Sequence, residues 1–234
     1  MTIRYTMTGD RANDHRVPVV GTIDGLSGPS FDLVLPVWVP GSYYILDYPR
    51  FVDGLTARLP SCGRSLPVER IDKGRWRITT EGADTVEVAY SIYAYQMVNE
   101  AIDVTDEHLF VNAALGLPYV EGRKDEPYEV ALHIPPDWKV YTELAEVGSA
   151  PPRFRAKDYD ELVDSPIDCG TPVDLGFHAA GIGNVDGVPA LGPANGIDHR
   201  RHNLCHHQPP EIAGMERFVE EQPALDGAET ESDE

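Results

Sequence analysis

The alternation of apolar and polar residues over the first 145 positions is the feature that most constrains this chain. From Val86 to Ala94 every second residue is apolar, while Thr85, Glu87 and Ser91 supply polar side chains between them. The segment 128–134 alternates in the same way. A period of two residues is typical of strands that bury one face, so both segments are predicted to be half-buried strands.

Further strands are expected where similar patterns recur between turn-forming residues. One of them is Leu33 to Val39, which Pro40 and Gly41 are expected to end. Many short strands without a long amphipathic helix between them indicate an all-β fold, an antiparallel β-sandwich of about eight strands. Beyond 84–95 and 128–134, strands are predicted near 2–8, 17–24, 29–39, 51–59, 75–79 and 107–113.

The composition changes after about residue 170. Seven glycines fall between 170 and 196, and an acidic end follows a histidine-rich stretch. This part of the chain contains few large apolar residues. The little apolar surface that they could bury cannot offset the entropy cost of ordering the chain. We therefore expect a β-sandwich over 1–176, followed over 177–234 by a mostly irregular, disordered Gly/Pro/His-rich linker and acidic tail.

The charge and the targeting signals limit the partners and the location. With 19 basic and 39 acidic residues, the formal net charge is −20. The electrostatic field of this negative charge repels phosphate groups, so nucleic-acid and membrane-surface partners are not expected. The N-terminus does not have the pattern of a signal peptide, and the three cysteines do not suggest a disulfide framework. These features favour a cytoplasmic location.

The segment LPVWVPGSYYILDYPRFV, residues 35–52, offers two candidate sites. Ser42 follows a glycine, but the bulky tyrosines after it do not suit a nucleophile elbow, so a turn serine is favoured. Tyr43, Tyr44 and Tyr48 could form a binding platform, but burial of their rings at a corner of the sandwich is favoured. Arg50 is expected to pair with a local acid such as Asp47.

The histidine-rich stretch is the candidate metal site. Its residue types suit zinc, but their spacing does not match a zinc finger or ribbon, and two neighbouring arginines would repel a cation. The His-Glu-x-x-His motif is absent, so we assign no catalytic residue and no cofactor to this chain. The weak candidate ligands are His199, His202, Cys205 and His206.

Several segments, in order along the chain, resemble the N-terminal domain of the glycyl aminopeptidase family. Members of this family are zinc metallopeptidases that often also carry a PDZ domain. The first is LPVWVPGSYYILDYPRFV; DEHLFVNAALGLPYVEGRKDEPYEVALHIPPDWKV and DYDELVDSPID follow it. The resemblance runs over roughly residues 3 to 176. It gives a structural family signature of Trp38, Pro40, Gly41, Ser42, Tyr43 and Arg50.

The resemblance implies a non-catalytic β-sandwich that precedes a thermolysin-like catalytic domain, which would hold the zinc and the general base. The expected function is that of an ancillary domain, truncated or stand-alone, that docks against a zinc catalytic domain or another protein surface. Two alternatives stay open. One is a peptide- or carbohydrate-binding sandwich that uses the three tyrosines. The other is a weak zinc-dependent peptidase that uses the tail histidines.

Overall fold

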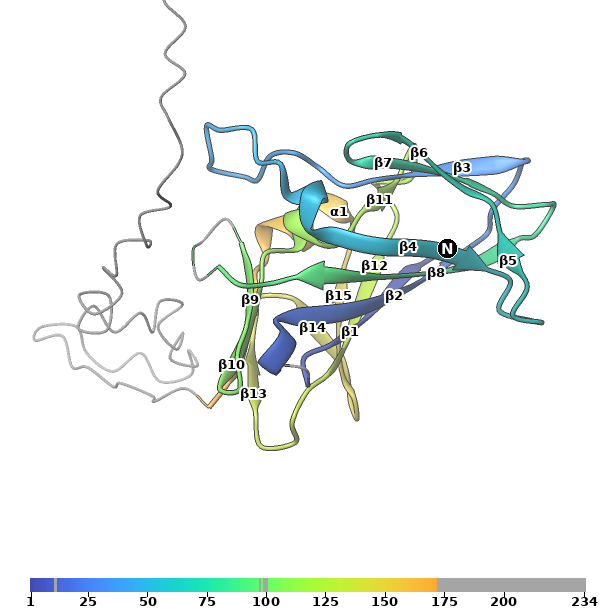
Figure 1. Ribbon diagram of the computed structural model, residues 1–234. Coiled ribbons are helices and arrows are strands. Elements are labelled where there is room, and N and C mark those ends of the chain that lie inside the picture. The colour runs from blue at the N-terminus through green and yellow to red at the C-terminus, as the bar shows by residue number, and fades with distance from the viewer. Residues whose placement is uncertain (11, 97, 99–100, 172–234) are drawn as a thin grey trace, which may run out of the picture. The chain divides into compact units, whose positions relative to one another are not determined.

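The computed structural model describes residues 1–171 except 11, 97, 99 and 100, and this part of the chain is mostly strand (Figure 1). The first eight strands are β1 (Ile3–Thr8), β2 (Arg16–Asp24), β3 (Ser30–Val34), β4 (Val52–Arg58), β5 (Ser65–Leu66), β6 (Val68–Asp72), β7 (Arg75–Thr79) and β8 (Thr85–Tyr93). The next eight are β9 (Ile102–Val104), β10 (His108–Val111), β11 (Tyr119–Val120), β12 (Tyr128–His133), β13 (Lys139–Tyr141), β14 (Ala145–Ser149), β15 (Pro152–Ala156) and β16 (Ile167–Gly170). The helical pieces are η1 (Ala12–Asp14), η2 (Tyr48–Phe51), η3 (Ala113–Leu115) and α1 (Tyr159–Asp164).

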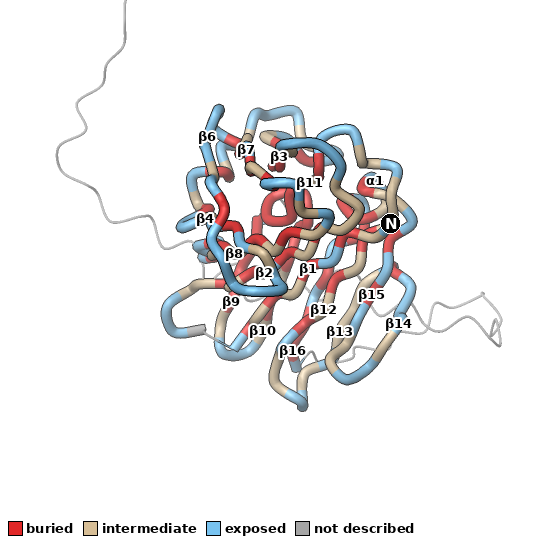
Figure 2. The backbone as a smooth tube through the Cα atoms, turned by 90° about the vertical axis from the view of Figure 1, so that its right-hand side faces the viewer, coloured by how far each residue is buried: buried red, intermediate tan, exposed pale blue. Residues whose placement is uncertain are grey.

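These strands form three sheets that share one hydrophobic core. The largest has the order β14-β15-β12-β1-β2-β8-β4-β5, and the smaller ones have the orders β13-β16-β10-β9 and β11-β3-β7-β6. Figure 1 shows the two small sheets toward opposite ends of the large one, and Figure 2 shows the buried backbone positions gathered between the layers. The predicted all-β class is confirmed.

The details of the fold differ from the prediction in two ways. The described residues contain sixteen strands rather than about eight, because short edge strands such as β6 bury almost no side chains and so lack a pattern. One pair in the large sheet, β1 with β12, is parallel, while the other pairs within the three sheets are antiparallel.

The predicted strand from Leu33 to Val39 was wrong for its last five residues, 35–39. Strand β3 ends at Val34, and the amide of Leu35 donates to the carbonyl of Gly74, 2.8 Å away. The next residue, Pro36, has no amide hydrogen, so it cannot continue the ladder. The chain therefore leaves the sheet five residues earlier than the apolar run suggests.

The predicted inward faces are confirmed in the central strands. Val86, Val88 and Tyr90 of β8 and Val130 and Leu132 of β12 are buried. Ile134, which follows β12, is only partly buried against the core. Strand β8 lies between β2 and β4 in the large sheet, so its inward side chains are covered by neighbours on both sides.

Three buried tyrosines hold the segment that follows η3. The hydroxyl of Tyr90 donates to the carbonyl of Gly116 at 2.7 Å. The hydroxyl of Tyr159 donates to Leu117 O at 2.8 Å, and that of Tyr5 donates to Pro118 O at 2.6 Å. Burial raises the pKa of all three phenols well above its usual value. Three different elements, β8, α1 and β1, thus satisfy three consecutive carbonyls inside the core.

Candidate functional site

The loop 37–46 projects from the domain after β3. The amide of Leu46 donates to the carbonyl of Val37 at 2.6 Å, which joins the two ends of the loop. Val39 is buried and anchors one side, while Gly41 turns the chain with a φ of +80°, a conformation that favours glycine. Such compact loops with close ends are held by their own contacts rather than by a sheet.

Four large apolar side chains of the loop point outward. Tyr43 is 98% exposed, Ile45 is 84% exposed and Tyr44 is 76% exposed, and Trp38 is about half exposed at 49%. The favoured prediction that these tyrosines bury their rings was wrong for Tyr43 and Tyr44. The reason is that backbone hydrogen bonds and Val39 hold the loop, so the tyrosines are not needed to fix the corner.

The other residues of the predicted signature have varied surroundings. Pro40 is exposed, beside the turn that Gly41 makes. The Oγ of Ser42 accepts a hydrogen bond from the amide of Tyr44 at 3.4 Å, so the turn-serine prediction is confirmed. Arg50 was expected to pair with Asp47, but its guanidinium carbon lies over a ring, 4.5 Å from the centroid of Phe51.

A second group of exposed side chains, Tyr93, Tyr95, Gln96 and Val98, lies beside the element that follows the loop. The hydroxyl of Tyr48 in η2 donates to Oε1 of Gln96 at 3.1 Å. Between these elements is a pocket of about 170 Å³ lined by Tyr48, Phe51, Tyr93, Tyr95, Gln96 and Ile102. Sequence analysis missed this pocket, although the uncharged run Tyr93–Val98 was a visible signal for an apolar surface.

An ionisable cluster lies on the sheet that contains β9, β10 and β16. Nε2 of His108 is 3.1 Å from Oδ2 of the buried Asp103, and Nδ1 is 3.0 Å from Oγ1 of Thr105. The contact with the Asp103 carboxylate raises the pKa of His108, against the opposing effect of burial. Burial raises the pKa of the neighbouring Asp168 carboxyl.

The raised pKa of His108 predicts a stability that falls with pH. The protonated ring is favoured in the folded state, so its contribution is full below the unfolded pKa of about 6.5 and is lost as pH rises through the folded value. Thermal melts of the wild type between pH 5.5 and 8.5 should show this decline, and His108→Gln should flatten it. An equal slope in the two proteins would contradict the assignment.

The metal candidates of the sequence are not tested by the structure. His199, His202, Cys205 and His206 all lie outside the described residues. Within 1–171, apart from the gaps, no group of three or more His, Cys, Asp or Glu side chains could hold a metal ion. In that same part of the chain, no helix is long and apolar enough to cross a membrane.

Comparison with known proteins gives the family. Residues 4–171 match the sequence profile described as the Peptidase M61 N-terminal domain. The crystal structure of an aminopeptidase N family protein from Idiomarina loihiensis is 34% identical, with a TM-score of 0.69 over 77% of this chain and 31% of that chain. An M1 zinc metallopeptidase from Deinococcus radiodurans is 9% identical, with a TM-score of 0.42 over 73% of this chain and 41% of that one. No curated protein matches at a comparable significance.

The protein is therefore of the class of N-terminal β-domains found in peptidases. The chain belongs to the Peptidase M61 N-terminal domain family, which confirms the resemblance seen in its sequence. The chain spans less than half the length of these two structural relatives.

Proposed function

We propose that this domain is a non-catalytic ancillary domain that docks against a zinc peptidase catalytic domain. The observation that carries the proposal is the family match over 4–171, combined with the 31% share of the Idiomarina loihiensis chain that the similarity covers. The zinc, the general base and the substrate site would belong to the remaining part of such a protein. No residue of this chain is given a catalytic role.

Binding in trans tests this proposal. The probe is the Idiomarina loihiensis protein without its matched segment, checked for folding and zinc content before use. The 234-residue chain should bind it with a Kd in the micromolar range or tighter, measured by calorimetry. The matched segment of the relative itself is the positive control. If that segment binds and this chain does not, the docking role is refuted.

A second candidate function is that of a peptide- or carbohydrate-binding module. The exposed rings of Tyr43 and Tyr44 favour it, because aromatic faces stack on ligands. Tyr48, the third tyrosine of that prediction, is only partly exposed and bonds to Gln96. Binding to insoluble polysaccharides that is lost on Tyr43→Ala and Tyr44→Ala would support this function.

The location in the cytoplasm is part of the proposal. Cys62 and Cys169 are both free thiols, which fits a reducing compartment. Labelling with a thiol reagent in intact and in lysed cells would test this location. In a reducing compartment the exposed thiol of Cys62 stays reduced, so it remains available to the reagent.

A further inference from the structure

The exposed large apolar side chains of the domain gather in two segments. We call the surface formed by Trp38, Tyr43, Tyr44, Ile45, Tyr95 and Val98 the aromatic face. These side chains are between 49% and 98% exposed. Tyr93, which is also exposed, lines the pocket beside this face, and the remaining exposed large apolar residues, Met1, Val20, Ile71 and Val147, are scattered singly over the described chain. Single exposed apolar residues are ordinary, whereas a cluster marks a surface that is covered by something else.

The composition of the aromatic face is that of an interface centre. The runs Trp38–Leu46 and Tyr93–Val98 contain no charged residue, although a quarter of the whole chain is charged. Protein interfaces are depleted of charge at their centre and enriched in tyrosine and tryptophan. The absence of charged residues from two surface segments is unusual in so acidic a protein.

The face is held in place before any partner arrives. The bond from Leu46 N to Val37 O closes the loop, and the bond from Tyr48 to Gln96 ties η2 to the second segment. The ring of His15, which bonds to the carbonyl of Val104, packs against the ring of Tyr95 in a tilted arrangement with centroids 4.1 Å apart. A preorganised surface loses less conformational entropy on binding, so more of the contact energy appears as affinity.

The pocket beside the face defines what a partner would insert. Its volume of about 170 Å³ is lined by aromatic rings, the side chain of Ile102 and one amide, Gln96. A cavity of about 150 Å³ holds benzene, so this pocket accommodates one aromatic or branched aliphatic side chain. Buried anchors of that kind dominate the affinity of many interfaces.

The chemistry of the face favours a protein over a sugar. Ile45 and Val98 add aliphatic surface, and the hydroxyl of Ser42 already accepts a bond from its own loop. A sugar site needs several placed polar groups to fix the hydroxyls. The residues that line the described part of the face and pocket are uncharged, and Arg50, which lies over the pocket residue Phe51, is the charged side chain that contacts this lining most closely.

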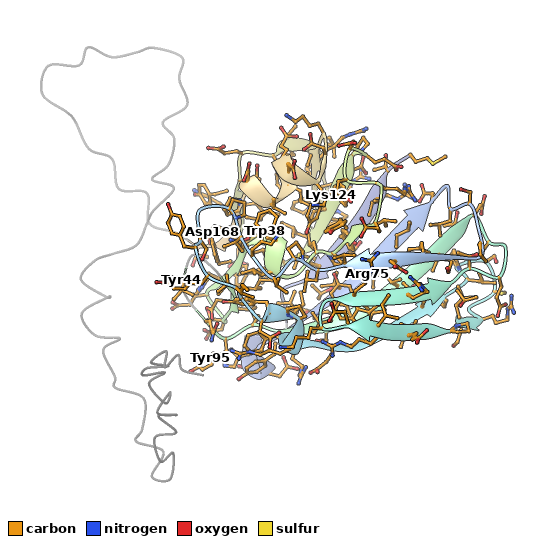
Figure 3. All side chains as sticks on the ribbon, turned by 90° about the horizontal axis from the view of Figure 1, so that it is seen from above. Trp38, Tyr44, Arg75, Tyr95, Lys124 and Asp168 are labelled. Carbon is orange, nitrogen blue, oxygen red and sulfur yellow. The ribbon has the colours of Figure 1, made fainter. Side chains whose placement is uncertain are left out.

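The position of the face selects one occupant. Figure 3 shows Tyr44 of the 37–46 loop, Tyr95 and the β16 residue Asp168 toward the same end of the domain. In this family the matched domain is N-terminal, so the polypeptide of a complete relative continues beyond the segment that contains β16. We propose that the aromatic face is the surface that receives the zinc catalytic domain, with the pocket taking one apolar side chain from it. This inference rests on the proposed function.

Charge introduced at the face tests the inference. Tyr44→Glu, Ile45→Glu and Tyr95→Glu are made in the 234-residue chain and titrated against the same truncated Idiomarina loihiensis protein. Each should weaken binding at least tenfold, because glutamate must be desolvated at the interface centre. The matched controls Ile71→Glu and Val147→Glu add the same charge at exposed sites elsewhere and should change the Kd less than twofold. Melting temperatures confirm that each variant is folded.

The outcomes separate the two proposals. If the wild type fails to bind while the relative's own segment binds, the docking function itself is refuted. If the wild type binds and the face variants bind equally well, docking stands but this surface assignment is overturned. A polysaccharide that binds the wild type and not Tyr44→Glu, with the peptidase probe unaffected, would make the face a carbohydrate platform and also overturn the assignment.

Discussion

Replacing Val88 by aspartate is expected to unfold the domain. The side chain of Val88 is fully buried in β8, where its neighbours across the sheet are Gly21 of β2 and Ala57 of β4. An unpaired carboxylate at this site costs several kcal/mol, which is comparable with a total stability of about 5–15 kcal/mol. Circular dichroism at 25 °C should show the loss of the cooperative melting transition.

The control for this prediction is Val20→Asp. Val20 lies on the neighbouring strand β2, but its side chain is 36% exposed, so the new charge can remain hydrated. We expect a loss of about 0.5 to 1 kcal/mol at most, in line with ordinary surface substitutions. A Val88→Asp protein that melts like the wild type would refute the inward orientation of β8.

Removing the three buried tyrosine hydroxyls is expected to have the second largest effect. Each change of Tyr5, Tyr90 or Tyr159 to phenylalanine leaves one buried carbonyl without its donor. Each should cost about 1–3 kcal/mol, and the triple variant should lose the most. Urea unfolding measures these losses, and Tyr43→Phe on the exposed loop should stay within about 0.5 kcal/mol of the wild type.

The same tyrosines predict an alkaline limit to stability. Their raised pKa values favour the neutral phenol in the folded state, so the stabilisation is full below the unfolded pKa of about 10 and falls as pH rises above it. The free energy of unfolding should therefore decline steeply above about pH 10 in the wild type. A decline of the same steepness in the triple phenylalanine variant would show that other groups control it.

The central strands could be predicted from the sequence because their environment is two-sided. β8 and β12 have a buried face and a partly exposed face, so every second residue is buried and apolar, and the alternation is visible in the sequence. Strand β9 is buried at all three positions, Ile102, Asp103 and Val104, so it does not alternate. The shortest strands are two or three residues long, which is too few for any period to be visible.

The candidate surface was harder to predict, because the orientation of a loop depends on contacts between distant residues. The sequence shows that 38–46 is aromatic and uncharged, but such a run is equally suited to burial or exposure. The outcome depends on the early end of β3 and on the bond between Leu46 and Val37. The pairing of Asp103 with His108 across neighbouring strands likewise depends on register, which turn residues alone do not set.

The parallel pairing of β1 with β12 has a consequence for how the polypeptide folds as it is synthesised. Ile3 is synthesised long before Tyr128, its partner on one side, so that edge of β1 stays uncovered until most of the domain has been made. Closing so long a loop is entropically slow, and contacts of high sequence separation lower folding rates. Until β12 leaves the ribosome, the β1 edge of the nascent sheet is open to pairing with other chains, and a chaperone bound there would protect it.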